Sequence, residues 1–182
     1  MVCNMRAMME PRNKDAIWLG EWYGAGELYI ERDYELFAVL AGVRDDFPAP
    51  PISRPRGIPK DCGSAYRGFV RQVSRELPGA VHSHSWVTLA ELLAYDLDQE
   101  FYDDSLVTQR DAAGNIVDTT DPANASLPNS GPVGRRRVFA LPPPNHCGRE
   151  QWDMIVGELR HAKEHWGLTS DEDVRLCFFF CA

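Results

Sequence analysis

The stretch that decides the fold lies at the C-terminus and reads Asp173-Val174-Arg175-Leu176-Cys177-Phe178-Phe179-Phe180-Cys181. Its apolar run is continuous rather than alternating, which is typical of a strand that is buried on both faces. Such a strand occupies a central position in its sheet. The sequence therefore predicts a sheet with a covering layer on each side.

A helix is predicted to begin after Asp33, whose carboxylate can accept hydrogen bonds from the free N–H groups of the first turn. Its apolar residues repeat at helical spacing and share one face. These residues are Leu36, Phe37, Leu40 and Val43. A helix that packs one face against the sheet is the expected structure.

Three more segments have helical signals. A short helix is predicted over 64–76, where Pro78 and Gly79 follow its end. Thr88 and Glu91 form the pattern of a capping box, which begins a helix that runs to about Tyr95. A last helix is predicted from residue 148 onward because apolar residues recur there at helical spacing.

The remaining segments predict turns, loops and short strands. The aromatic segment 16–23 is expected to be the returning strand of a hairpin, closed by glycines at 24–26. The proline-rich segment 47–59 predicts an ordered loop. Residues 103–145 resemble a variable insertion with a hairpin, and the polar part at 121–134 predicts a mobile loop.

Together these elements predict a single α+β domain over residues 1–182. Its mixed or antiparallel sheet includes both terminal strands, and three to four helices pack on it. At 182 residues the chain is long enough to bury a core without metals or disulfides as staples.

Composition excludes some classes of function. The net charge is −8, which argues against a general nucleic-acid binder because such proteins neutralise phosphates with basic surfaces. The local run at 135–137 is three arginines, and it is interpreted as a solvated loop or strand end. No membrane span and no signal peptide are expected. The host cytoplasm is the expected location, with an assembled virus particle as the alternative.

Three motifs carry a resemblance to a known family. They are Asp33-Tyr34-Glu35-Leu36-Phe37-Ala38, Pro55-Arg56-Gly57-Ile58-Pro59 and His82-Ser83-His84-Ser85-Trp86. The chain resembles a family of small, mostly uncharacterised proteins from bacteriophages and their bacterial hosts. Family members open with a Met-Gly-Cys-Asp-Ile-His strand and close on a strand that ends Phe-Trp-Phe-Asp-Asn. The similarity covers most of the chain outside about 103–145, and it implies no particular activity.

The family's polar set is altered in this chain. Asn4 replaces the family's acid, Arg6 replaces its histidine, and Cys181 stands where the closing strand usually carries an acid. An arginine repels a cation and is never deprotonated at working pH. We therefore expect no metal and no other cofactor at this strand. Arg6 is a candidate for binding an anion, and a salt-bridged arginine is the alternative.

Two further groups are candidate site residues. His82 and His84 would point to one face if their segment is extended, so they could form half of a metal site or an acid–base pair. The alternative is that His84 only hydrogen-bonds the loop before the Thr88 helix. Arg56 is held between a proline and a glycine, which suits recognition of an anion and suits equally a structural tie to Asp61 or Asp33.

The five cysteines have irregular spacing and no Cys-x-x-Cys pair, which argues against a zinc ribbon. Cys177 and Cys181 lie four apart on one strand, so their Cα atoms should be about 13 Å apart. That separation is too large for a disulfide. If a cysteine links two subunits, Cys181 is the candidate because it lies beside the terminus.

Three hypotheses about function follow. The first is a non-catalytic phage or prophage accessory protein that binds a small anionic ligand or a protein partner through Arg6, Arg56 and His84. The second is a structural component of a virus particle, which would self-associate. The third is a metal-dependent, hydrolase-like enzyme with His82 and His84 as its active residues. The altered polar set favours the first two.

Overall fold

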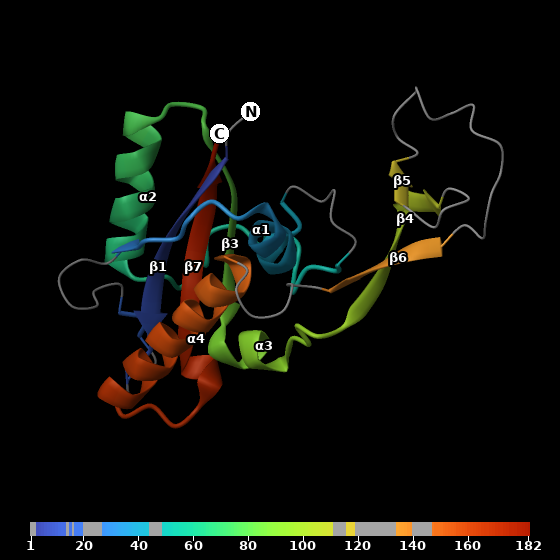
Figure 1. Cartoon of the computed structure of the whole chain (residues 1–182). Helices are drawn as coiled ribbons and strands as arrows, with labels where there is room; N and C mark the ends of the chain where they lie inside the picture. The colour runs from blue at the N-terminus through green and yellow to red at the C-terminus, as the bar shows by residue number, and fades with distance from the viewer. Residues whose placement is uncertain are drawn as a thin grey trace.

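The structure is a computed structural model, and it describes residues 3–13, 15, 17–19, 27–43, 49–110, 116–118, 134–139 and 147–182. For 100–110, 116–118, 134–139 and Cys147 it describes the backbone only. The expected mobile loop at 121–134 lies outside the described residues except for Gly134, the first residue of a strand. Figure 1 shows the chain from its N-terminal strand to its C-terminal strand, and the two ends lie close together.

The main sheet is antiparallel and has the strand order β2-β1-β7-β3. Its strands are β1 (Asn4–Pro11), β2 (Glu27–Leu28), β3 (Val81–Thr88) and β7 (Val174–Cys181). Every residue of β7 is buried, and β7 pairs with β1 on one side and β3 on the other. The prediction of a central, doubly covered C-terminal strand is confirmed.

Helices cover both faces of the main sheet (Figure 1). One face packs against α2 (Ser64–Glu76), and the core there includes Tyr66, Val73 and Phe179. The other face packs against three helices. The larger core between them includes Phe37 from a helix and Phe180 from β7. These helices are α1 (Tyr34–Ala41), α3 (Leu89–Ala94) and α4 (Cys147–His165). The α+β fold class, with both terminal strands in an antiparallel sheet, is thus confirmed.

The predicted helix caps are present. Asp33 Oδ1 accepts a hydrogen bond from the Leu36 N–H at 2.8 Å. Thr88 and Glu91 form a complete capping box at the start of α3. Because β3 ends at Thr88, this box fixes the point at which strand becomes helix. The helix over 64–76 has the predicted bounds.

A second, three-stranded sheet has the order β5-β4-β6 and comes from the segment interpreted as an insertion. Its strands are β4 (Glu100–Arg110), β5 (Ile116–Asp118) and β6 (Gly134–Phe139). Figure 1 shows this sheet extending away from the main sheet. The three arginines at 135–137 lie in β6 rather than in a loop.

The predicted return of the chain beside the N-terminal strand is present in the described residues 17–19, and a second segment also pairs with that strand. The strand that pairs with β1 is β2, in the register Ala7↔Leu28 and Met8↔Glu27. Within the predicted segment 16–23, the described residues 17–19 pair with the end of β1 through an antiparallel bridge between Arg12 and Trp18 and a hydrogen bond from the Leu19 N–H to the Pro11 carbonyl. Trp18 is buried against Arg175, and residues 16 and 20–23 lie outside the described residues.

Candidate functional site

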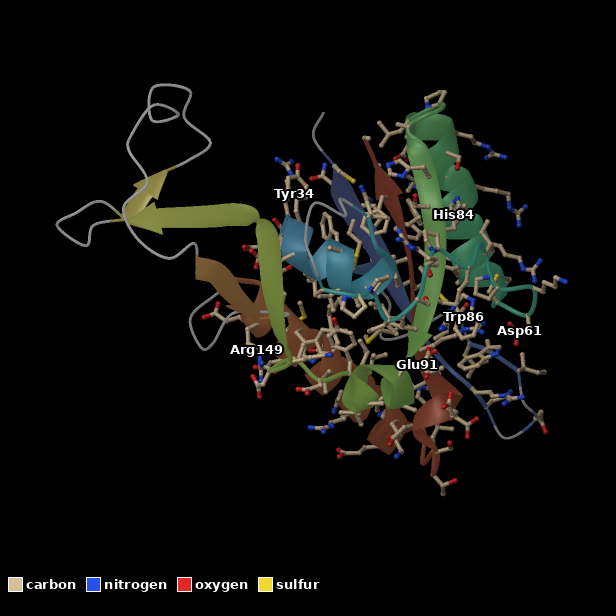
Figure 2. All side chains as sticks on the ribbon, turned by 90° about the vertical axis from the view of Figure 1, so that its right-hand side faces the viewer. Tyr34, Asp61, His84, Trp86, Glu91 and Arg149 are labelled. Carbon is tan, nitrogen blue, oxygen red and sulfur yellow. The ribbon has the colours of Figure 1, made fainter. Side chains whose placement is uncertain are left out.

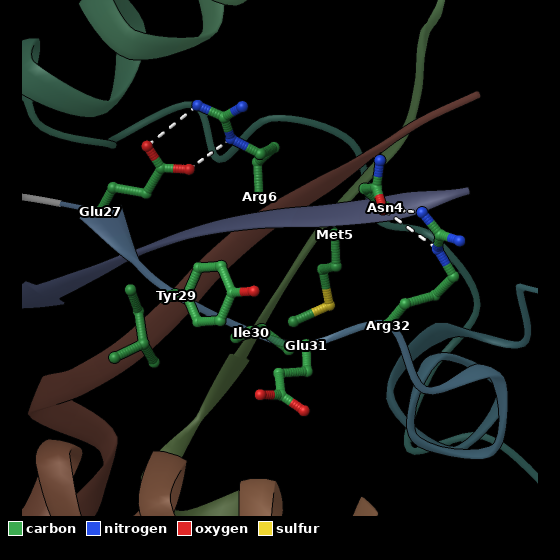
Figure 3. A pocket seen from close by; sticks show the side chains of 9 residues that line it. Asn4, Met5, Arg6, Glu27, Tyr29, Ile30, Glu31 and Arg32 are labelled. Carbon is green, nitrogen blue, oxygen red and sulfur yellow. Dashed lines mark hydrogen bonds and ion pairs between the residues drawn. The ribbon is translucent and has the colours of Figure 1, made fainter. Parts of the chain in front are cut away.

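A pocket of about 530 Å³ lies beside β1, where the chain leaves β2 and runs towards α1 (Figure 3). Its lining comes from two segments, the first half of β1 and the residues from β2 to Arg32. The lining residues are Asn4, Met5, Arg6, Glu27, Leu28, Tyr29, Ile30, Glu31 and Arg32. The family resemblance placed its polar set on this same strand, at positions 4 and 6.

Two hydrogen-bonded pairs organise the polar side of the pocket. Arg6 forms an ion pair with Glu27 and donates from Nη2 to Glu27 Oε2 at 3.0 Å. Arg32 donates from Nε and from Nη2 to Asn4 Oδ1, at 3.2 and 2.9 Å. Figure 3 shows both pairs on the same side of β1. This is expected because residues i and i+2 of a strand share a face.

The two arginines therefore have partners of different charge. The interpretation of Arg6 as a salt-bridged residue agrees with its contact to the Glu27 carboxylate. Arg32, in contrast, is held by an uncharged amide oxygen, and the described part of the chain places no carboxylate within ion-pair distance of it. Asn4 thus orients the Arg32 guanidinium without neutralising it. Part of that guanidinium stays open to the pocket, since Arg32 is exposed.

The rest of the pocket combines apolar and aromatic groups. Met5 and Ile30 are buried, with 3% and 7% of their surfaces exposed. Tyr29 is 79% exposed at the rim. Exposed tyrosines are common at binding surfaces because the ring offers contact area at a low cost in conformational entropy. The pocket therefore offers a cation, an exposed ring and an apolar floor.

A second polar group fills the far end of the same sheet face. Arg175, with 3% of its side chain exposed, donates from Nε and Nη2 to the fully buried Glu10 at 3.0 and 2.8 Å. Its Nη1 donates to Asp61 at 3.1 Å. Arg175 also lies over the Trp18 ring, 3.7 Å from the centroid. All of its charge is satisfied internally, so this group ties β7 to β1 and to the loop before α2.

Asp61 and Trp18 complete this buried group. The Trp18 indole donates to Asp61 Oδ2 at 2.8 Å. Burial acts to raise the pKa of Asp61, but the hydrogen bonds from Trp18 and Arg175 outweigh it and lower the pKa below its usual value. The carboxylate is therefore committed to structure, although 65% of its side chain is exposed.

Arg56 has a structural role that differs from both ties considered for it. Its guanidinium pairs with Glu91 of the capping box, at 2.9 Å from Nη1 to Oε2, and donates to the Trp86 carbonyl. It also lies over the Trp86 ring, 4.6 Å from the centroid. The expected partners Asp61 and Asp33 bind other groups. Figure 2 shows Trp86 and Glu91 near each other at one end of β3.

The histidine pair does not form one site. The strand β3 has an irregular register between His82 and Ser85, and Ser83 adopts a positive φ of 52°. Such a bulge adds a residue and reverses the face that follows it. His82 therefore stacks on Phe180 at 6.2 Å and His84 contacts Phe179 at 5.3 Å. Because Phe179 and Phe180 are consecutive in a strand, these rings lie on opposite faces of the sheet.

His84 is better suited to packing than to catalysis. Burial, and then the charge of His82, lower the pKa of His84 below its usual value. A neutral imidazole against the Phe179 ring is the result. The described residues contain no group of three or more His, Cys, Asp or Glu side chains that could hold a metal ion.

The cysteines whose side chains the structure describes are all buried. They are Cys3, Cys62, Cys177 and Cys181. Cys177 and Cys181 point to the same face as expected, and they remain separate. Cys181, the candidate for a link between subunits, is buried, with only 6% of its surface exposed. It pairs in register with Asn4 and with Val81, so strands cover it on both sides.

The three residues predicted to bind a ligand therefore do not lie together in one site. Arg6 lies in the pocket, whereas His84 packs against the core and Arg56 is committed to Glu91. Arg32 could not be identified from the sequence, because its hydrogen-bond partner Asn4 lies 28 positions away. Glu10 and Arg175 were not predicted as partners either. Their signal was present, since each is a charged residue within a terminal strand and those strands were expected in one sheet.

No family model matches the sequence, and no curated protein and no solved structure matches the chain. Among the described residues, no helix combines the length and the apolar character needed to cross a bilayer. The pocket beside β1 is therefore the candidate functional site.

Proposed function

We propose that this chain is a non-catalytic binding protein, of the bacteriophage or prophage accessory kind that its motifs resemble. It binds a small anionic ligand in the pocket beside β1. The ligand's carboxylate or phosphate contacts Arg32, with the Asn4 amide N–H groups as additional donors.

The observation that carries this proposal is the neutral partner of Arg32. A planar guanidinium suits carboxylate and phosphate groups, and it binds them best when it is already oriented. Asn4 supplies that orientation through two hydrogen bonds to one oxygen. Had position 4 been an acid, as in the resembling family, the pair would be electrically neutral. The asparagine keeps one positive charge available.

The remaining polar groups support binding rather than catalysis. His82 and His84 contact opposite faces of the sheet, which removes the geometric basis for a shared active site. Arg56 and Arg175 each hold a carboxylate within the fold. The pocket itself supplies fixed charges and hydrogen-bond donors, which is what recognition of an anion needs.

The proposal is tested by isothermal titration calorimetry of the purified protein with acetate, hexanoate and inorganic phosphate. A single oriented and exposed guanidinium supports a dissociation constant on the order of 1 mM. The Arg32→Gln variant should weaken binding by about tenfold. Arg160→Gln is the matched control, because Arg160 is exposed on α4 and its loss changes the net charge equally. Equal affinities of both variants and wild type would contradict the proposal.

The structural-component hypothesis is a second candidate, and one observation favours it. The sheet β5-β4-β6 extends away from the main sheet (Figure 1), as an arm that contacts a neighbouring subunit would. The mass of the protein in solution, measured together with its metal content, separates the candidates. A large, metal-free oligomer favours assembly. A monomer that binds anions favours the accessory protein, and stoichiometric zinc would favour an enzyme.

A further inference from the structure

We propose that the outer face of α2 is a docking surface for an acidic segment of a partner protein, a helix that carries a carboxylate in every turn. This surface shares no residue with the pocket beside β1, so the inference goes beyond the proposed function. It depends on a row of arginines whose charge is not neutralised within the described part of the chain.

The row of arginines follows the outer face of α2. Arg67, Arg71 and Arg75 are spaced one turn apart, and all three are exposed. The opposite face of the helix carries Tyr66 and Val73, which are buried against the main sheet. Figure 1 shows α2 on the outside of the molecule, across the main sheet from the other helices. Eight residues of an α-helix advance by about 12 Å, which is the length of the row.

The arginines of the row have only neutral partners. Arg67 donates from Nε to the Cys62 carbonyl and from Nη2 to the Lys60 carbonyl. The Arg71 Nε donates to the Arg67 carbonyl. Glu76, the acid of this helix, instead accepts a hydrogen bond from a glutamine side chain. Among the described ion pairs, none includes an arginine of α2, so three positive charges face outwards.

A glycine lies within the row and leaves space for a partner. Gly68 shares a face with Arg71 and Arg75, and it is exposed. A Cβ added at Gly68 would meet no atom within 4 Å, and its φ is not positive. Glycine disfavours a helix interior, and neither packing nor backbone conformation within the chain requires it here. A position without a side chain does allow another backbone to approach closely.

The charge of the whole chain selects the class of partner. A guanidinium binds carboxylates and phosphates equally well in geometry. The net charge of −8 repels a nucleic acid, whose many phosphates extend beyond a row of about 12 Å. An anionic membrane requires an amphipathic helix with a free apolar face, but the apolar face of α2 is buried. A protein helix with Asp or Glu in successive turns matches the row in both length and charge.

The test is an NMR titration of the full-length, ¹⁵N-labelled protein with an alanine-based helical peptide that has glutamate at every fourth position. The matched peptide has glutamine at the same positions. The glutamate peptide should bind with a dissociation constant on the order of 1 mM at low salt and shift the amide signals of α2. The glutamine peptide should bind at least about fivefold more weakly, the factor for one exposed ion pair. Added salt should weaken the glutamate peptide because exposed charges are screened.

Two variants with matched controls test the row and the glycine. Arg71→Gln should weaken the glutamate peptide about fivefold, whereas Arg160→Gln, at an exposed position of α4, should not. Gly68→Gln should raise the urea midpoint of unfolding and yet weaken peptide binding about fivefold. Gly157→Gln is its control, because Gly157 is exposed on α4 with the same open space around it. That control should raise the midpoint and keep the wild-type affinity.

The outcomes separate this inference from the proposed function. Equal affinities for the two peptides, or wild-type affinity in Arg71→Gln, would overturn the docking surface. Tighter binding of a single-stranded oligonucleotide or of phosphatidylserine vesicles than of the glutamate peptide would overturn the choice of partner. Arg32→Gln should bind the glutamate peptide as wild type does, so a failure of anion binding in the pocket leaves the surface on α2 standing.

Discussion

Replacing Glu10 with alanine should destabilise the protein more than any other single change to its polar groups. Glu10 is fully buried, and its carboxylate accepts hydrogen bonds from the Arg175 guanidinium, the Gly63 N–H and the Cys177 thiol. The substitution removes all of these acceptors. The Arg175 side chain is only 3% exposed, so its charge is then buried without the Glu10 carboxylate.

The size of the effect follows from this burial. Removing one partner of a buried ion pair typically lowers the free energy of unfolding by about 3–5 kcal/mol, and we expect about 3 kcal/mol for Glu10→Ala. The lower end applies here because Asp61 still contacts Arg175, although 65% of the Asp61 side chain is exposed. A typical domain has a total stability of about 5–15 kcal/mol, so the variant should unfold far more readily.

Urea denaturation, followed by tryptophan fluorescence, measures the change as a shift in the midpoint at constant slope. Glu164→Ala is the control, and it should change the unfolding free energy by less than about 0.5 kcal/mol. The double variant Glu10→Met with Arg175→Met should recover much of the loss, because neither charge is then buried alone. A loss below about 1 kcal/mol in Glu10→Ala would refute the view that this pair fixes β1 to β7.

Three other predictions concern pH, thiols and metal. Burial acts to raise the pKa of Glu91, but hydrogen bonds, first from Arg56, lower it below its ordinary value of 4.5. The stability it supplies is present above about pH 4.5 and is lost as the pH falls through the lower, folded pKa. Unfolding free energies measured from pH 7 to pH 3 should therefore converge for wild type and Glu91→Gln, and a constant gap would argue against this. Cys177 and Cys181 should be found unbridged by mass spectrometry, and both should react slowly with a thiol reagent in the folded state. Elemental analysis should find no stoichiometric divalent metal, and metal that disappears in Asn4→Ala would show the opposite.

Much of the fold could be predicted because its signals are local. The apolar run of the C-terminal strand is self-evident from its residues, and so are the caps at Asp33 and Thr88, whose partners lie three residues away. The strand predicted least well depends on a distant partner. The two-residue strand β2 carries no pattern of its own, and it pairs with β1 only because the chain returns beside it.

The site could be predicted only in part for the same reason. Arg6 was identified because the family resemblance drew attention to its position. His82 and His84 do not share a face of β3, because Ser83 between them adopts a positive φ and reverses the direction of the side chains that follow. Arg56 binds neither of the two acids considered for it, because its partner Glu91 lies 35 residues away in the capping box of α3. Spacing along the sequence does not encode such contacts.

The most direct test of the account is the anion affinity of the Asn4→Asp variant. This change keeps the size of the side chain and its hydrogen bonds to Arg32, and it alters only the charge of the acceptor. Calorimetry with hexanoate should show binding weakened by about tenfold, because Arg32 is then neutralised within the protein. Wild-type affinity in a correctly folded Asn4→Asp variant would contradict the claim that the asparagine preserves the charge used for binding.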